Sequence, residues 1–355
     1  MKRLLVLFCG LMMVLGLQAQ RVIRVEAGSA ESLLAAIEEA NTVNAEKDAE
    51  RLYILLPNGV YDLGDRVLTR LSGHNVSIIG ESTDGTIIQN MPDYHKEGIS
   101  RTGTIQNRGW NNYYQDLTLK NRLEYYKAGE DGRAVCLHDK GNRTICNRVR
   151  MLSYQDTYYS DKEDCEHYLQ ETEIHGTVDF ICGAGDVWFE RCLFVTEKRT
   201  PDGSGRNVIV APRTANTPWG YIFNHCTIKN DVSVYHYARG WHTNPRCVWL
   251  YTMLLTPEKL LPTRFDPQGM KISSNYFKEY GTMDANGRNI CPKSNVLYFT
   301  LRDLTQPFIA ETILSEKETK QFTIKNVFGD WHPDEVLKEQ ERVAKALWAT
   351  HRGNR

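Results

Sequence analysis

The feature that most constrains the fold is a recurring unit in which two polar residues precede a short alternating strand. Four segments share this unit: YYQDLTLKN, ICNRVRML, WFERCLFV and IFNHCTIKN. Their matching positions are Leu117, Val149, Cys192 and Cys226, and the interval from Val149 to Cys192 is clearly the longest. Such irregular spacings do not suit the blades of a propeller, but they suit a solenoid whose coils carry loops of different lengths.

Short β-rich runs, separated by Gly, Asn and Asp, continue from Leu52 through most of the chain. Helix-length amphipathic segments are absent between these runs, which argues against an alternating β/α fold. A β-sandwich would need more hairpin turns of the Asn-Gly type than the chain contains. The sequence therefore predicts an all-β fold, namely a right-handed single-stranded parallel β-helix.

One helix is predicted near each end of this β-helix. The segment SAESLLAAIEEAN has Ser29 as its N-cap and an apolar face, and DWHPDEVLKEQERVAKALW begins at Pro333 with acidic residues in its first turn. An open coil end exposes unpaired backbone groups and core side chains. We therefore expect an N-terminal capping helix, and a C-terminal helix that covers the other end.

The first residues, MKRLLVLFCGLMMVLGLQAQ, have the pattern of a secretory signal peptide. A basic start precedes an apolar run that is too short for a membrane anchor, and Ala19 ends a plausible cleavage site. We expect residues 1–19 to be removed and residues 20–355 to form a single exported domain, either periplasmic or secreted. No later segment reaches the apolar length of a membrane span, so stable membrane insertion is not expected.

Charge and cysteine usage exclude several classes of protein. The formal net charge is −1, and it becomes −3 when Lys2 and Arg3 are removed, so nothing supports nucleic-acid binding. The cysteines form no CxxC pair and no cluster with zinc-ligand spacing, and we assign no metal site. No Gly-x-Ser-x-Gly segment occurs, which argues against a serine esterase.

Two aspartates stand out as candidate catalytic residues. Asp179 lies within HGTVDFICGAG, where its apolar neighbours predict a buried strand, and Asp156 precedes it in SYQDTYYS. If the interval from Asp156 to Asp179 is one coil, the two backbones stack about 4.8 Å apart. Two carboxylates that close cannot easily both ionise, so one keeps its proton. The same interval, counted back from Asp156, reaches Arg133, which predicts a ladder of three charged residues.

Other polar and aromatic residues near this pair could take part in chemistry. Gln155 offers an amide donor beside Asp156. In YARGWHTNP, a single glycine separates Arg239 from Trp241, so both side chains could project from one face of a strand.

These motifs together resemble the pectin methylesterases, carbohydrate esterase family eight, over nearly all of residues 20–355. YQDTYY is similar to the family's Gln-Asp-Thr-Leu-Tyr, GTVDFICG to Gly-Thr-Val-Asp-Phe-Ile-Phe-Gly, and ARGW to Gly-Arg-Pro-Trp. NGVYDLGDRV, VSIIGESTDGTII and FKEYGTMDANG also resemble family segments, in the family's order. The order and spacing of the motifs carry the resemblance, since each motif alone is weak.

The resemblance implies a parallel β-helix that removes methyl groups from galacturonate esters without metal or cofactor. The implied substrate and partner is methylesterified homogalacturonan, a pectic polysaccharide, and a monomer is expected. The motif residues carry over as Asp179 (nucleophile), Asp156 (general acid/base), Gln155 (oxyanion donor), Arg239 (orienting the nucleophile), and Trp241, Tyr158 and Thr177 (substrate binding).

One position departs from the family pattern in a way that bears on activity. Arg133, in RAVCL, stands where the family usually has Gln, another oxyanion donor. Arg133 could stabilise an oxyanion, or it could pair with Asp156 and spoil the acid. The alternatives are therefore a catalytically altered relative that binds pectic polysaccharide or hydrolyses another ester, and a pectate lyase, which would need an acidic calcium site.

Overall fold

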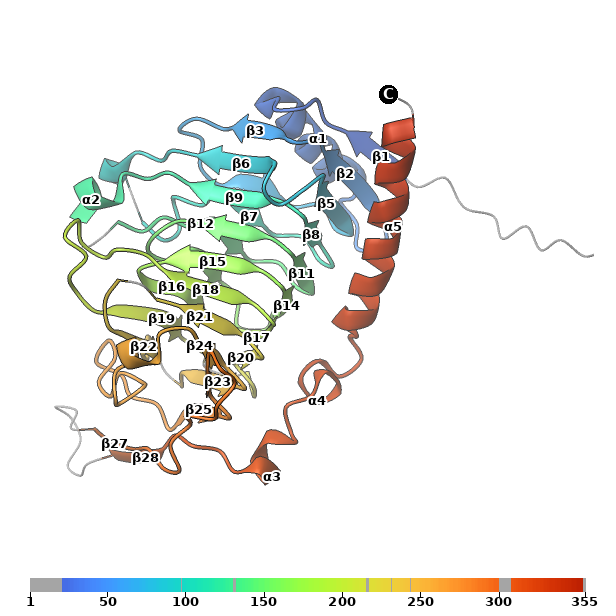
Figure 1. Cartoon of the computed structure of the whole chain (residues 1–355). Coiled ribbons are helices and arrows are strands. Elements are labelled where there is room, and N and C mark those ends of the chain that lie inside the picture. Colours follow the sequence, from blue (N-terminus) through green and yellow to red (C-terminus); the bar gives the residue numbers. More distant parts are fainter. Residues whose placement is uncertain are drawn as a thin grey trace, which may run out of the picture.

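Three parallel β-sheets, wound from one chain, make up the body of the protein (Figure 1). The computed structural model describes residues 21–353 except residues 97, 130–131, 215–216, 231, 243 and 300–307. Each coil adds one strand to each sheet in turn, and every pairing within the three sheets is parallel. The predicted right-handed parallel β-helix is confirmed.

Sheet A is the ten-stranded sheet of this β-helix. It contains, in spatial order, β1 (Arg21–Arg24), β2 (Leu52–Leu56), β5 (Val76–Gly80), β8 (Tyr113–Gln115), β11 (Thr144–Asn147), β14 (Glu166–Gln170), β17 (Asp186–Glu190), β20 (Tyr221–Asn224), β23 (Arg246–Leu250) and β25 (Tyr276–Tyr280).

Sheets B and C complete each coil. Sheet B contains β3 (Gly59–Asp62), β6 (Thr86–Asn90), β9 (Thr118–Asn121), β12 (Arg150–Leu152), β15 (Glu173–Gly176), β18 (Leu193–Thr196), β21 (Thr227–Lys229), β24 (Met253–Leu254) and β26 (Met283–Asp284). Sheet C contains β4 (Thr69–Leu71), β7 (Ile105–Asn107), β10 (Leu137–Asp139), β13 (Tyr158–Ser160), β16 (Val178–Gly183), β19 (Asn207–Pro212) and β22 (Tyr235–Ala238).

The inward-facing side chains of the three sheets form one continuous hydrophobic core. Because successive coils are in register, like side chains stack on one another. Phe189, Phe223 and Trp249 occupy equivalent positions in β17, β20 and β23, with ring centroids 4.5 and 3.9 Å apart and planes within 10° of parallel. Stacked aromatic pairs add to the free energy gained by burial, so this column joins neighbouring coils.

The recurring polar pair of the sequence marks the bend between sheet A and sheet B. The second residue of each pair has a left-handed backbone, with φ of 53° at Asp116, 51° at Arg148 and 49° at Arg191. Glu171, with a φ that is also 49°, lies at a further bend that the sequence pattern did not reveal. The long interval between Val149 and Cys192 therefore holds two coils rather than one.

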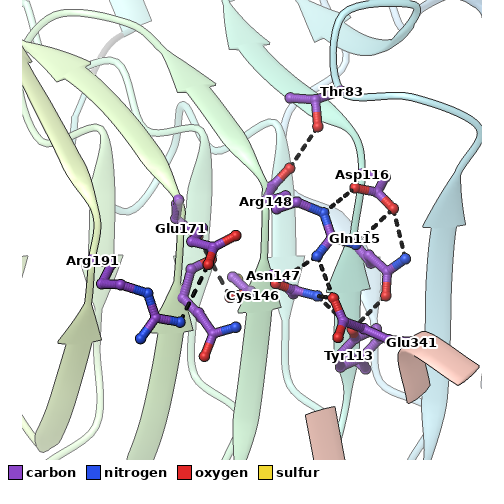
Figure 2. Close-up of polar contacts among 12 residues, drawn as sticks. Thr83, Tyr113, Gln115, Asp116, Cys146, Asn147, Arg148, Glu171, Arg191 and Glu341 are labelled. Atoms are coloured by element: carbon purple, nitrogen blue, oxygen red, sulfur yellow. Dashed lines mark hydrogen bonds and ion pairs between the residues drawn. The ribbon is translucent and has the colours of Figure 1, made fainter. Parts of the chain in front are cut away.

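Charges of opposite sign alternate along these bends (Figure 2). Nε of Arg148 donates to Oδ1 of Asp116 at 2.7 Å, and Nη2 of Arg191 contacts Oε1 of Glu171 at 3.2 Å. Each pair joins a bend to the bend of the preceding coil. The polar residues that reveal the repeat in the sequence thus also help to hold its register.

The N-terminal helix, α1 (Ala30–Val43), closes the first end of the coil as predicted. The side chain of Ser29 accepts a hydrogen bond from the backbone N–H of Ser32 and caps the helix. The apolar face of α1 joins the main core through Leu33, Ala36, Ile37 and Ala40.

The C-terminal helix is present as α5 (Pro333–Gly353), but the prediction that it covers an end of the coil is wrong. It runs along the outside of sheet A (Figure 1). Its apolar side packs on outward-facing residues of β2 and β5; the contacts involve Val343, Ala344, Leu347 and Trp348 on the helix and Tyr53, Leu55 and Ile79 on the sheet. Those strand residues are apolar on the outer face as well as the inner one, and the helix removes them from water.

Polar contacts fix the position of α5 on the sheet. Ser77 donates to Oε1 of Gln340 at 2.9 Å, and Glu341 accepts hydrogen bonds from Asn147 and Arg148 (Figure 2). The far end of the coil is instead closed by the hairpin of β27 (Val296–Phe299) and β28 (Phe308–Glu311), since Leu297, Phe299 and Ala310 belong to the main core.

Short helices complete the chain; they are α2 (Tyr125–Ala128), α3 (Glu316–Thr319), α4 (Ile324–Phe328), and the 3₁₀ turns η1 (Tyr94–Lys96) and η3 (Pro257–Lys259). Within the described ranges, no helix has both the length and the apolar composition needed to cross a bilayer. The predicted signal peptide, residues 1–19, lies outside the described residues.

Candidate active site

A cleft of about 290 Å³ opens on the outer face of sheet C, and the candidate residues gather in it. Asp156, Asp179, Gln155, Arg133, Arg239 and Trp241 all line this cleft. They come from four different parts of the sequence, between positions 133 and 241. Winding of the coils is what brings these side chains together.

The two aspartates occupy equivalent positions in successive coils, as their spacing predicts. Strand β13 pairs with β16 so that Tyr158 lies opposite Ile181, and the same offset relates Asp156 to Asp179. Both have left-handed backbones, with φ of 59° and 53° respectively. Left-handed backbones are uncommon outside glycine, and they gather at functional sites where the surrounding structure enforces them.

A β-bulge in β16 directs Asp179 into the cleft. The pairing of β16 with β19 shifts between Val178 and Ile181, so that Asp179 and Phe180 together stand opposite one residue, Ile209. Val178 and Asp179 consequently both face the cleft, whereas Phe180 and Ile181 both face the core. Bulges are known to redirect side chains in this way next to active sites.

Gly176 makes room for this bulge. A Cβ atom at Gly176 would lie 2.1 Å from Cβ of Phe180 and 2.4 Å from the carbonyl oxygen of Tyr154. Any larger side chain would collide with the folded-back Phe180. Gly176, which begins the GTVDF segment, therefore permits the bulge that positions Asp179.

Arg239 holds the carboxylate of Asp179 through two hydrogen bonds. Nε donates to Oδ1 at 2.8 Å and Nη2 donates to Oδ2 at 2.5 Å. Burial raises the pKa of Asp179 above its usual value, and the charge and hydrogen bonds of Arg239 oppose that rise. This arrangement favours the anionic form of a buried carboxylate and fixes its orientation.

Asp156 is the member of the pair whose pKa is raised more strongly. Burial raises its pKa well above the usual value, the negative charge of Asp179 raises it further, and the charge of Arg133 opposes both effects only in part. Sγ of Cys182 lies 3.7 Å from Oδ1 of Asp156 and donates to it. The cleft therefore holds two carboxyl groups on adjacent coils, and the pKa of Asp156 is raised further than that of Asp179.

Arg133 reaches the cleft one residue out of register with the predicted ladder. Its backbone pairs with Gln155 rather than with Asp156. The preceding coil is shorter, since the interval from Leu137 to its partner Tyr158 is smaller than that from Tyr158 to its partner Ile181. The guanidinium nevertheless approaches the acid, with Nε 3.9 Å from Oδ2 of Asp156. That distance gives an electrostatic contact rather than a hydrogen bond.

Trp241 forms part of a second wall of the cleft. Its ring lies 6.1 Å from that of Tyr159, and the guanidinium of Arg213 lies 5.4 Å from the centre of the Trp241 ring. The outer face of sheet C thus offers aromatic surface beside the carboxylates.

Two of the predicted substrate-binding residues do not reach the cleft. Tyr158 is fully buried in the core, where its hydroxyl forms a hydrogen bond of 2.8 Å with Nδ1 of His167. Thr177 is also fully buried and donates to the hydroxyl of Tyr125 at 3.1 Å. Side chains alternate along a strand, so Tyr159 faces outward where Tyr158 faces inward.

Other residues of the cleft were missed by the sequence analysis. Arg199 lines it from the segment after β18, and Ile99 and Met270 line it from loops. Alternation within the YYS segment indicates that Tyr159 faces outward, where it packs beside Trp241. No sequence pattern relates residues 99, 199 and 270 to the aspartates. Among the residues that the structure describes, no group of three or more His, Cys, Asp or Glu side chains is arranged to hold a metal ion.

The family of the chain follows from its match to a family model. The sequence model of the family described as Pectinesterase matches residues 22–280. The chain belongs to the pectinesterase family.

Pectinesterase relatives are distant in sequence. The chain is 27% identical to probable pectinesterase 50 of Arabidopsis thaliana over 209 residues, which cover 57% of this chain and 54% of that protein. It is 26% identical to pectinesterase 3 of Solanum lycopersicum over 227 residues, 61% of this chain and 40% of that protein. The chain thus spans about half the length of the curated relatives it matches.

Solved structures of pectin methylesterases share the fold. Pectin methylesterase PemA of Erwinia chrysanthemi superposes with a TM-score of 0.66 at 20% identity, covering 88% of this chain and 98% of that one. The enzyme from carrot superposes with a TM-score of 0.67 at 19% identity, covering 88% and 94%. At identities this low, the structural likeness shows only the parallel β-helix fold. The activity has to be inferred from the site residues.

Proposed function

We propose that this protein is a pectin methylesterase that hydrolyses methyl esters of galacturonate to give pectate and methanol. The observation that carries the proposal is that Asp179, held by two hydrogen bonds from Arg239, lies in one cleft with Asp156, whose pKa is raised well above its usual value. Family membership and solved relatives that bind oligosaccharides support the same substrate class.

In the first step, a carboxylate oxygen of Asp179 attacks the carbonyl carbon of the ester. The two hydrogen bonds from Arg239 leave Asp179 little freedom to rotate, so the attacking group is already oriented. Negative charge develops on the former carbonyl oxygen. Gln155 lines the cleft beside the pair and donates its amide N–H to this oxyanion.

Asp156 then supplies the proton that the leaving group needs. The bond between the carbonyl carbon and the methoxy oxygen breaks, methanol leaves with the proton, and an anhydride joins Asp179 to the galacturonate. Asp156, now ionised, takes a proton from water as that water attacks the anhydride. The reaction releases galacturonic acid, which gives its proton to bulk water to become the carboxylate, and restores both aspartates to their starting states.

Arg133 is compatible with this mechanism in its present position. Its Nε lies 3.9 Å from Oδ2 of Asp156, beyond hydrogen-bond distance, and the pKa of Asp156 remains raised despite its charge. From the same wall of the cleft, Arg133 contributes positive charge to the oxyanion in place of the glutamine that pectin methylesterases usually carry.

A second candidate function is binding of pectic polysaccharide without hydrolysis, or hydrolysis of another ester. The replacement of Gln by Arg133 beside the acid is the observation that favours it. Release of methanol from highly methylated pectin separates the two functions. Loss of that release in Asp179→Asn assigns it to this cleft, and absence of release from the unaltered protein would overturn the proposal.

Export is part of the proposal. The composition of residues 1–19 supports a signal peptide cleaved near Ala19, and an exported monomer that acts on homogalacturonan in the periplasm or outside the cell. The N-terminal residue of the protein recovered from culture, together with its mass in solution, tests both statements.

A further inference from the structure

Cys182 places a thiol in the cleft beside the carboxyl group of Asp156. After the bulge of β16, Phe180 and Ile181 face the core, whereas Cys182 faces outward, as Asp179 does. Sγ of Cys182 lies 3.7 Å from Oδ1 of Asp156 and donates to it. In GTVDFICG this cysteine stands where the family motif has Phe, a residue with no hydrogen bond to donate.

The surroundings of the thiol leave Asp156 as its polar partner. Cys182 packs against Val135, Tyr159 and Ala211 on the outer side of sheet C. These neighbours are apolar or aromatic. Within the described part of the chain, Oδ1 of Asp156 is the acceptor that receives the hydrogen of this thiol.

Buried thiols elsewhere in the β-helix have a different kind of acceptor. Sγ of Cys136, Cys192 and Cys226 donates to backbone carbonyl oxygens, at 3.4 to 3.5 Å. Those contacts join neighbouring parts of the coils. The contact of Cys182 instead joins a thiol to a group that the proposed reaction protonates and deprotonates.

The carboxyl group of Asp156 is held less firmly than that of Asp179. Arg239 gives Asp179 two hydrogen bonds, whereas among the described residues Cys182 supplies the one hydrogen bond that the Asp156 carboxyl receives. Arg133 adds an electrostatic contact to the other oxygen, Oδ2, at 3.9 Å. The thiol therefore distinguishes the two oxygens of Asp156.

The environment of the thiol keeps it protonated and so able to donate. Burial raises the pKa of Cys182 well above its usual value, and the charge of Asp156 raises it further. An S–H group donates more strongly to an ionised carboxyl than to a neutral one. Accordingly, the hydrogen bond from Cys182 acts to lower the pKa of Asp156.

Resting on the proposed function, we propose that Cys182 is a positioning residue for the general acid/base. Its S–H group occupies Oδ1 of Asp156, so Oδ2, on the side of Arg133, carries the proton that passes to the methoxy oxygen. Once that proton has left, the same S–H group stabilises the Asp156 carboxylate, which then takes a proton from water. The thiol keeps its own hydrogen throughout.

Infrared spectroscopy tests this contact in the absence of substrate. The S–H stretching band lies where other protein groups absorb little, and it moves to lower frequency when the hydrogen bond strengthens. One S–H band of the unaltered protein should move to lower frequency as Asp156 ionises, with the same midpoint pH as the loss of its carboxylic acid band. The thiols that donate to backbone carbonyl oxygens should give bands that stay constant in the same spectra.

Variants assign the band that moves. Cys182→Ala and Cys182→Ser should each remove it, and Asp156→Asn should abolish its dependence on pH. A Cys182 band that stayed at one frequency while Asp156 titrated would overturn the proposal.

The pH profile of hydrolysis gives a second measurement. Cys182→Ala removes the donor, so the alkaline limb of kcat/KM should move to higher pH by roughly half a unit. Cys182→Ser retains a donor and should leave the limb near its parental position. A packing defect alone would lower kcat or stability without moving the limb, so an unmoved limb in Cys182→Ala would overturn the proposal.

The matched control is Cys291→Ala. Cys291 is partly exposed and does not line the cleft, so its removal should change neither the moving band nor the alkaline limb.

The outcomes distinguish this proposal from the esterase proposal. The infrared shift requires only the two side chains, so its presence in a protein that releases no methanol would remove the esterase proposal and keep the contact between thiol and carboxyl. Methanol release with a Cys182 band that does not respond to pH would keep the esterase and overturn the role of Cys182.

Discussion

Arg239 holds Asp179 by the same two-point contact that Arg148 makes with Asp116, on a different edge of the coil. In each pair Nε donates to Oδ1 and Nη2 to Oδ2, at 2.8 and 2.5 Å for Asp179 and at 2.7 and 3.1 Å for Asp116. Both aspartates have φ of 53°. The first pair faces the cleft, and the second lies at an outer bend (Figure 2).

This likeness provides a control for the assignment of the nucleophile. Asp179→Asn should reduce methanol release from methylated pectin by at least about 10⁴-fold, because an amide cannot replace the attacking carboxylate. Circular dichroism should remain that of the parent. Asp116→Asn perturbs a similar ion pair at a similar bend and should retain activity. Equal losses in the two variants would mean that Asp179 acts only through the fold.

The pH dependence of hydrolysis should be bell-shaped. Asp179 must be ionised to attack, and burial raises its pKa, so kcat/KM should fall as pH drops through that pKa. Asp156 must be protonated to release methanol, and burial together with the charge of Asp179 raises its pKa further, so kcat/KM should fall again as pH rises through it. The two limbs belong to the coupled pair.

Initial rates on a methylated oligogalacturonide, from about pH 3 to pH 9, measure both limbs. A rate that rose continuously with pH would contradict the assignment, since it would require an acid/base that works only when deprotonated.

Coil arithmetic predicted the carboxylate pair because one whole coil, from Asp156 to Asp179, carries no insertion. The same arithmetic was wrong by one residue for Arg133. It predicted Asp156 as the residue next to Arg133, but the preceding coil is shorter and the backbone of Arg133 pairs with Gln155.

Tyr158 was misassigned because the motif was followed and alternation was ignored. Tyr158 packs in the main core, whereas Tyr159 packs on the outer side with Trp241.

The position of α5 shows what an amphipathic pattern leaves open. The pattern shows that the helix has an apolar side, but it does not show which surface that side covers. The LYILL run of β2 held that information, since all of its residues are buried and both faces of the strand must therefore be covered. Arg199 has no comparable signal, because its place in the cleft depends on the conformation of the loop between β18 and β19.

Replacement of Arg133 should move the alkaline limb of the pH profile. Its positive charge, 3.9 Å from Oδ2 of Asp156, lowers the pKa of that group, so Arg133→Gln should shift the limb to higher pH. Arg133→Lys keeps a charge and should shift it less. A rise in the rate at the optimum would show that Arg133 impedes the reaction, and a fall would show that it stabilises the oxyanion.

Gly176 offers a test of the bulge itself. In Gly176→Ala the new Cβ would lie 2.1 Å from Cβ of Phe180, so Phe180 must move and the bulge that turns Asp179 into the cleft must distort. We expect the free energy of unfolding to fall by about 1–3 kcal/mol, as for other overpacked sites. We also expect a fall in kcat that is much larger than the change in KM. Thermal unfolding and methanol release measure the two effects separately.

The control for this substitution is Gly64→Ala. Gly64 has a left-handed backbone, with φ of 60°, but no atom lies within 4 Å of an added Cβ. That variant bears only the strain of the backbone, about 1–2 kcal/mol, and should keep its kcat. If Gly176→Ala lost stability and yet turned over substrate at the parental rate, the bulge would not be what positions Asp179.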